Sequence, residues 1–109
     1  MQERDFQRDL IKHLKLLLPG CIVMKNDARY RQGFPDLTIY YKDHYIVLEC
    51  KNRSKAHRQP NQEPYVEMIC KMGGYARFVY PENEEEILNE ISEAFGVART
   101  ARHTKRKSE

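Results

Sequence analysis

Hydrophobic residues recur every three or four positions in three segments of the chain, with polar residues between them. This spacing places the hydrophobic side chains on one face of an α-helix. We therefore predict helices at residues 2–18, 60–72 and 83–96. In the second helix the residues expected to face the core are Tyr65, Met68, Ile69 and Met72. Asn83 and Glu86 have the spacing of a capping box at the start of the third helix.

The other hydrophobic segments are short and rich in β-branched and aromatic residues, which is typical of β-strands. Residues 33–41 and 45–51 flank a polar turn at residues 42–44, so they predict a β-hairpin. Residues 21–24 and 75–80 predict two further strands. A helix separates the last two strands, which indicates a right-handed crossover to a parallel neighbour. The predicted fold class is α/β, in the order α-β-β-β-α-β-α, with a mixed sheet flanked by helices.

The chain of 109 residues fits a single domain. We assign residues 1–96 to this domain and residues 97–109 to a basic tail, which lacks a hydrophobic pattern and is expected to be disordered. The formal net charge is +3, and the tail supplies the excess through Arg99, Arg102, Lys105, Arg106 and Lys107. Residues 82–93 are strongly acidic, so a dipolar surface would present its basic side to a phosphate backbone.

No hydrophobic run approaches the roughly 18 residues of a membrane-spanning helix, and the first residues lack the pattern of a secretory signal. We therefore expect an intracellular protein without a membrane partner. Cys21, Cys50 and Cys70 are an odd set without close pairing, and no Cys and His cluster has the spacing of a zinc site. We expect buried free thiols in a reducing compartment.

The candidate chemistry lies at one end of the predicted hairpin. Pro35 cannot donate to a strand ladder, so it starts the first strand and places Asp36 at the first paired positions. Glu49 and Lys51 project to one face of the second strand because side chains alternate. Two converging carboxylates can bind a hard divalent cation, which polarises a phosphoryl oxygen. With a lysine to orient water or stabilise charge, the pattern indicates phosphodiester hydrolysis; the alternative is a surface hairpin with solvated charges.

Basic and amide residues flank this end of the hairpin in the sequence and are candidates for nucleic-acid binding. They are Lys25, Asn26, Arg29 and Arg31 before it, and Arg53, Lys55 and Arg58 after it. The alternative for both segments is a solvated loop. We favour contact with a substrate, because sites are often built on loops that a rigid scaffold holds.

The Pro-Asp pair at residues 35–36, followed by Glu-Cys-Lys at residues 49–51, resembles the signature of the PD-(D/E)XK nucleases. The Gly-x-Pro-Asp start at Gly33 and the downstream Gln62 resemble the virus-type replication-repair branch, VRR-NUC. The resemblance extends over about residues 3–80. Its motifs are short, but their order and spacing together are fairly specific.

This resemblance implies a restriction-endonuclease-like core and a DNA endonuclease that uses Mg²⁺ or Mn²⁺ and no small-molecule cofactor. The implied metal ligands are Asp36, Glu49, the backbone carbonyl of Cys50, and Glu3, which would reach a second ion or a metal-bound water. The implied catalytic residues are Asp36, Glu49, Lys51 and Gln62, with Gln62 supporting Lys51. The alternatives are an ordinary helix-start acid at Glu3 and an exposed residue at Gln62. Position 50 is usually aliphatic in the family, but the ligand there is the carbonyl.

Small standalone members of that family are commonly phage-encoded homodimers associated with branched DNA such as four-way junctions. The resemblance therefore implies a homodimer acting on branched DNA, in the host cytoplasm if a phage encodes it. Tyr40, Tyr41 and Tyr45 would form an aromatic interface between subunits, or else pack within the sheet. Two other functions remain open: a non-catalytic nucleic-acid-binding protein with the nuclease fold, and a subunit that binds a protein through the acidic last helix.

Overall fold

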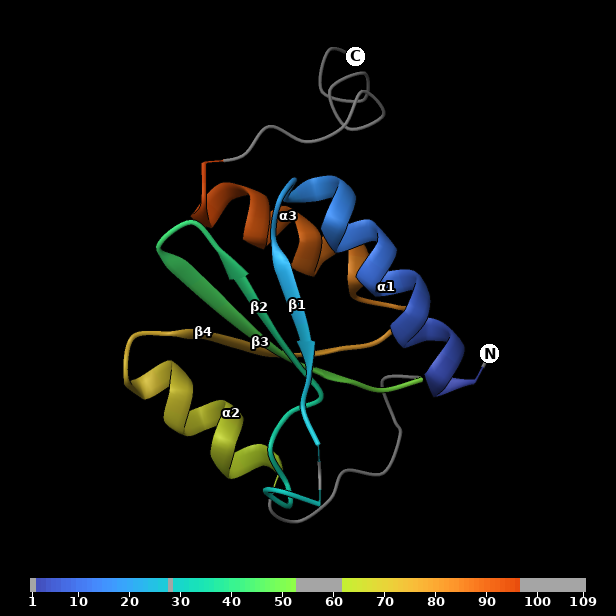
Figure 1. Ribbon diagram of the computed structural model, residues 1–109, viewed down its shortest axis with the longest axis vertical. Coiled ribbons are helices and arrows are strands. Elements are labelled where there is room, and N and C mark those ends of the chain that lie inside the picture. Colours follow the sequence, from blue (N-terminus) through green and yellow to red (C-terminus); the bar gives the residue numbers. More distant parts are fainter. Residues whose placement is uncertain (1, 28, 53–61, 97–109) are drawn as a thin grey trace.

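The computed structural model describes residues 2–27, 29–52 and 62–96 (Figure 1). Its elements follow the predicted α-β-β-β-α-β-α order. They are α1 (Glu3–Leu17), β1 (Ile22–Lys25), β2 (Leu37–Tyr41), β3 (His44–Cys50), α2 (Gln62–Lys71), β4 (Tyr75–Val79) and α3 (Glu84–Ala94). No helix in the described ranges is both long and apolar enough to cross a membrane.

The strands form one mixed sheet in the order β1-β2-β3-β4. The first three strands are antiparallel neighbours, and β4 runs parallel to β3. The hairpin turn is tighter than predicted, because His44 pairs with Tyr41 and leaves only Lys42 and Asp43 in the turn. Lys42 adopts a positive φ of 56° there. The chain then crosses through α2 to reach β4, so the predicted parallel crossover is confirmed.

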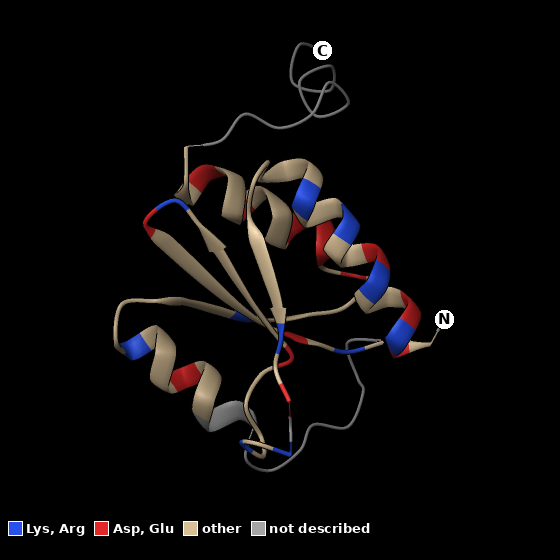
Figure 2. Cartoon of the chain, viewed as in Figure 1, with Lys and Arg blue, Asp and Glu red and all other residues tan. Residues whose placement is uncertain are grey.

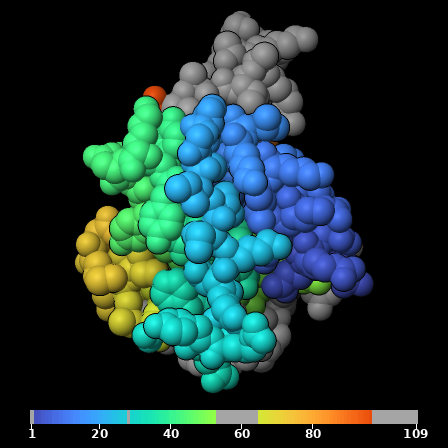
Figure 3. Space-filling model, in the orientation of Figure 1, coloured from blue at the N-terminus to red at the C-terminus, as the bar shows by residue number. Residues whose placement is uncertain are grey.

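Helices cover both faces of the sheet, with α1 and α3 on one face and α2 on the other (Figure 1). Strand alternation turns one set of side chains toward α1 and α3, where they form the main core. In the sheet this set includes Leu37, Ile39, Ile46, Leu48 and Cys50. A smaller core on the other face joins Val47 to Ile69 of α2 and Ala76 of β4. Figure 3 shows that the edge strand β1 lies at the surface beside α1.

The prediction that four residues of α2 face the core was wrong for Met68 and Met72. These side chains are 53% and 72% exposed, whereas Ile69 is buried. The helix ends at Lys71, before Met72, and Gly73 follows with a φ of 93°. Gly73 therefore ends the helix in the left-handed conformation, and the helix turns only a narrow stripe toward the sheet.

Two further local predictions were wrong. Asn83 does not cap α3 through its side chain; its Oδ1 accepts from the Tyr80 N–H at 2.9 Å and its Nδ2 donates to the Phe78 carbonyl at 3.1 Å. It therefore closes the turn between β4 and α3. The three cysteines are free thiols, but only Cys50 is buried and Cys70 is exposed. Cys70 is in α2, and its S–H donates to the Ala76 carbonyl of β4.

Candidate active site

Asp36 and Glu49 face each other where β2 begins and β3 ends. The register pairs Leu37 with Leu48, so the next position brings Asp36 opposite Glu49 on the sheet face that carries α2. The Asp36 N–H donates to Oε1 of Glu49 at 3.0 Å. The Cys50 N–H donates to Oδ2 of Asp36 at 2.9 Å. These two bonds hold each carboxyl group against the backbone of the opposite strand.

Lys51 comes directly after β3 and completes a buried ionic cluster with the two acids. Its N–H donates to the Val79 carbonyl at 2.9 Å, which extends the ladder between β3 and β4. Its Nζ lies 3.3 Å from Oε2 of Glu49, and the two side chains are only 7% and 1% exposed. A buried ion pair contributes little to stability compared with packed hydrophobic residues. Its presence here points to a chemical role.

The pKa values of both carboxyl groups are raised. Burial raises the pKa of Glu49 to about 7, the charge of Asp36 contributes further, and Lys51 opposes the shift. Burial also raises the pKa of Asp36, against the hydrogen bonds that it makes with the Cys50 N–H and with Glu49. A cation beside the two groups would offset their repulsion and favour their ionised forms.

The oxygen donors at this strand end suit a hard divalent cation such as Mg²⁺ or Mn²⁺. Asp36 and Glu49 supply carboxylate oxygens. The Cys50 carbonyl faces the same side as its N–H, toward Asp36, because a strand residue points both groups to one neighbour. The Cys50 thiol packs in the main core, and burial raises its pKa, so its sulfur is not a ligand.

Glu3 lies in the first turn of α1, within electrostatic reach of the ionic cluster. Burial raises its pKa, the charge of Asp36 raises it further, and Lys51 lowers it. Among the described residues, no three Asp, Glu, His or Cys side chains are grouped closely enough to hold one metal ion. The position of Glu3 thus fits a contact through water or a second ion better than direct binding beside Asp36 and Glu49.

Asn26, predicted to contact nucleic acid, has a structural role in the loop between β1 and β2. Its Nδ2 donates to the Pro35 carbonyl at 2.9 Å and to Oγ1 of Thr38 at 3.0 Å. Its backbone N–H donates to the Asp36 carbonyl at 2.8 Å. Asn26 therefore fixes the segment that presents Asp36, and both hydrogens of its amide nitrogen are used within the protein.

The predicted basic residues before the hairpin differ in how they are engaged. Lys25 is exposed at the end of β1. Arg29 donates to Asp27 through Nε at 3.2 Å and Nη2 at 3.1 Å and lowers the pKa of that carboxyl, so this pair is neutral. Arg31 donates to the Tyr65 hydroxyl at 3.4 Å. It makes no ion pair with any side chain that the structure describes.

Four other predicted site residues fall outside the described side chains. Gln62 is the first residue of α2, but only its backbone position is described. Arg53, Lys55 and Arg58 lie in the segment between residues 52 and 62, outside the described ranges. Their proposed roles stay predictions.

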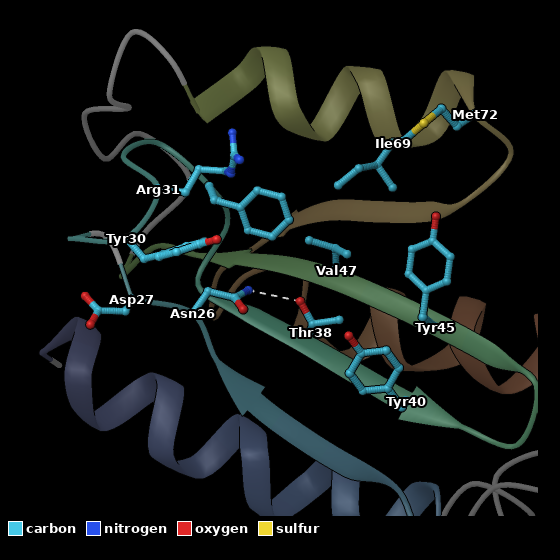
Figure 4. Close-up of a pocket in the computed structure, with 11 residues that line it drawn as sticks. Asn26, Asp27, Tyr30, Arg31, Thr38, Tyr40, Tyr45, Val47, Ile69 and Met72 are labelled. Carbon is cyan, nitrogen blue, oxygen red and sulfur yellow. Dashed lines mark hydrogen bonds between the residues drawn. The ribbon is translucent and has the colours of Figure 1, made fainter.

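A pocket of about 550 Å³, which the sequence pattern did not predict, lies between the sheet and α2. Aromatic rings line much of it, and Figure 4 shows how they surround the space. They belong to Tyr30, Phe34, Tyr40 and Tyr45. The register pairs Tyr40 with Tyr45, so alternation alone turns both toward the face of Asp36 and Glu49. The alternation of side chains along the two strands was therefore the signal in the sequence that could have revealed the pocket.

The site has to be interpreted from its own geometry. No protein-family model matches the chain, and no curated protein matches it. Acidic and basic positions lie close together where the hairpin strands and β1 converge (Figure 2). Buried carboxylates beside a lysine can hold a hard cation and stabilise a developing negative charge. The arrangement is thus suited to chemistry on an anionic ester.

Proposed function

We propose that this protein is a divalent-metal-dependent nuclease that hydrolyses phosphodiester bonds in DNA. The observation that carries the proposal is the buried cluster of Asp36, Glu49 and Lys51 at one strand end. Burial raises the pKa of Glu49 to about 7, and the neighbouring charge of Asp36 raises it further. A fold would gain stability by replacing such groups with packed hydrophobic residues, so a role in binding a cation and a phosphate accounts for them better.

In this proposal Asp36, Glu49 and the Cys50 carbonyl hold Mg²⁺ or Mn²⁺. Such an ion, when bound, polarises a phosphoryl oxygen and makes coordinated water more acidic. The protein contributes by fixing the two carboxylates through the Asp36 and Cys50 N–H groups. It also limits the access of bulk water, because Glu49 and Lys51 are buried. Glu3 would contribute through water or a second ion rather than as a direct ligand beside Asp36 and Glu49.

Lys51 is proposed to orient the attacking water and to stabilise negative charge on the phosphate. Its contact with Oε2 of Glu49 keeps the ammonium beside the metal ligands. A flexible side chain with one compact charge suits this task, whereas a planar guanidinium would present its donors differently. We assign to Gln62 the support of Lys51, on the strength of the family resemblance.

The resemblance to the VRR-NUC branch supports DNA as the substrate and branched DNA, such as a four-way junction, as the preferred form. The observed order of helices and strands is the order that this resemblance implies. It also supports a homodimer, whose two-fold axis would place two sites at a fixed separation for paired cuts. Sedimentation should then give twice the chain mass, and dilution into monomers should reduce junction cleavage.

The experiment that tests the proposed function is digestion of a DNA panel with and without Mg²⁺. The panel contains single-stranded, duplex, flap and four-way-junction DNA. We expect cleavage only with the metal, and faster cleavage of the junction than of linear duplex. DNA binding without cleavage under any metal condition would favour the alternative, a non-catalytic nucleic-acid-binding protein with this fold.

A further inference from the structure

The sheet face beneath α2 is only half covered. The smaller core joins Ile69 of α2 to β3 and β4, and no helix in the described ranges covers β1 and β2 on this side. Side chains on the uncovered half remain exposed although they are large and apolar. Exposure is 59% for Ile22, 50% for Met24, 48% for Tyr40 and 40% for Tyr45. We call the pocket of about 550 Å³ that lies between this half of the sheet and α2 the open pocket.

The open pocket has the size and lining of a small-ligand site. Its volume lies within the roughly 300–1,000 Å³ range of such sites. The rings of Tyr30, Tyr40 and Tyr45 surround the space, and the Tyr30 and Tyr40 hydroxyls turn toward its middle (Figure 4). Flat aromatic walls with a few polar atoms are suited to a planar heterocycle, which stacks on rings and uses its edge for hydrogen bonds.

Two walls of the open pocket are held by packing. The Tyr45 hydroxyl lies so close to Gly74 that an added Cβ there would come within 2.5 Å of it. Phe34 packs edge-on against Tyr65 of α2, with ring centroids 5.3 Å apart. Preformed walls reduce the entropy lost when a ligand binds.

The open pocket and the candidate active site lie along the same two strands. Thr38 and Val47 line the pocket and pair with each other in the register of β2 and β3. Asp36 and Glu49 lie two residues farther along the same strands, on the same face, which corresponds to about 7 Å. A nucleotide whose phosphate lies at the two acids can therefore place its base in the pocket.

The charge at the mouth of the open pocket suits a phosphate. Arg31 lines the pocket, and its guanidinium donates to the Tyr65 hydroxyl. The one carboxylate among the described residues of the lining, Asp27, is paired with Arg29 and so is already neutralised. A cation with no carboxylate partner among the described side chains is available for a backbone phosphate.

We infer that the open pocket binds an unpaired nucleobase of the DNA strand whose phosphate lies at Asp36 and Glu49. This inference rests on the proposed function, because it takes that function's phosphate position as its starting point. Bases inside a duplex are stacked and paired, so they cannot enter such a pocket without being extruded. The site therefore favours DNA in which the nucleotide next to the cleaved bond is already unpaired, as in a flap, or is easily unpaired, as at a branch point.

The test compares two ligands of equal charge: a short oligothymidylate, and an abasic phosphodiester oligomer of the same length. Binding is measured in EDTA, so that no cleavage interferes. Stacking of one base predicts that the wild type prefers the oligothymidylate by about 5- to 150-fold. Tyr30→Ala should remove most of this preference without affecting folding, because Tyr30 is 87% exposed. Tyr30→Phe, which keeps the ring, should retain it.

The control variant is Leu16→Ala, which removes a 71% exposed side chain on α1, away from the pocket. It should leave the preference unchanged. Equal binding of the two oligomers by the wild type, or a preference unaffected by Tyr30→Ala, would overturn the inference. If Tyr30→Ala instead dissociates a dimer while leaving base preference intact, the open pocket is an interface between copies of the chain, and the inference is wrong.

The two proposals fail separately. If base preference depends on Tyr30 but the protein never cleaves DNA with Mg²⁺, the open pocket is supported as a base site and the nuclease proposal is wrong. If cleavage depends on the metal but there is no base preference, the nuclease proposal is supported and the open pocket is not a base site.

Discussion

The sheet face beneath α1 and α3 is closed and apolar, whereas the face beneath α2 is partly open and carries the charged cluster. On the closed face Leu10, Leu14 and Ile39 are completely buried. On the other face Glu49 and Lys51 are buried as well, at a cost in desolvation. The two faces therefore differ in their role. Hydrophobic packing on one face stabilises the fold, and this stabilisation offsets the cost of burying charged groups on the other.

Leu14→Ala should show most clearly that the two faces have different roles, because it should reduce stability and leave the cleavage rate unchanged. It removes a completely buried side chain from the main core. We expect the free energy of unfolding to fall by about 2–5 kcal/mol, while the folded protein cleaves DNA at the wild-type rate. Urea unfolding measures the first effect, and the matched control is Leu16→Ala, which should stay within about 0.5 kcal/mol of wild type. Similar destabilisation by both variants would contradict the described packing of α1.

A substitution in the charged cluster should reduce the cleavage rate, whereas the substitution in the main core reduces stability. Lys51→Ala should slow single-turnover cleavage by about 10²–10³-fold, as for loss of one donor that stabilises transition-state charge. DNA binding should be largely retained, and Lys51→Arg should restore only part of the rate. The control is Lys71→Ala, which removes an exposed lysine on α2. Cleavage by Lys51→Ala within a few-fold of wild type would reduce Lys51 to a structural ion-pair partner.

Stability without metal should fall as the pH rises through the range in which Glu49 titrates. Its folded-state pKa is about 7, above its ordinary value of 4.5. The stability gained from the protonated form is therefore complete below pH 4.5 and is lost as the pH rises through 7. We expect a loss of about 1 kcal/mol per pH unit in this window, a smaller loss in Glu49→Gln, and recovery with Mg²⁺ mainly at the alkaline end.

Urea unfolding across this pH window, with and without Mg²⁺, measures the effect. A wild-type stability that rises with pH there, or a slope unchanged by Glu49→Gln, would contradict the raised pKa of the cluster.

The smallest effect is expected from the basic tail at residues 97–109, which lies outside the described residues. Truncation after Ala98 removes Arg99, Arg102, Lys105, Arg106 and Lys107. Cleavage of short DNA should remain, while binding weakens and the salt dependence flattens by about one unit of slope for each phosphate that the protein no longer binds. Filter binding over a salt series would measure this. Unfolding of the truncated protein would show instead that the segment is structural.

The order of elements could be predicted because each strand and helix has a clear hydrophobic period. The approach of Asp36 to Glu49 also followed from the hairpin, since Pro35 and strand alternation place both acids at one end. The predictions that were wrong concerned burial, which depends on how far one element covers another in the folded chain. The stripe of α2 looked uniform in sequence, yet only Ile69 meets the sheet fully, and Met68 and Met72 remain exposed.

Side-chain bonding was equally hard to predict. Asn83 has the spacing of a capping residue, but the backbone groups of Tyr80 and Phe78 compete successfully for its amide. From the sequence, Asn26 was a candidate for binding nucleic acid in a basic loop, yet its side chain donates hydrogen bonds to Pro35 and Thr38. In both cases the partner is close only once the chain has folded, so local pattern does not reveal it.

The most direct test of the account is DNA cleavage by Asp36→Ala and Glu49→Ala beside the wild type, with Mg²⁺ and with EDTA. Glu86→Ala, at an exposed position of α3, is the matched control. We predict that wild type and Glu86→Ala cleave only with Mg²⁺ and that both cluster variants are inactive although folded, because each lacks a metal ligand. Cleavage by wild type in EDTA, or by either cluster variant with Mg²⁺, would contradict the assignment of the carboxylate pair as the metal site.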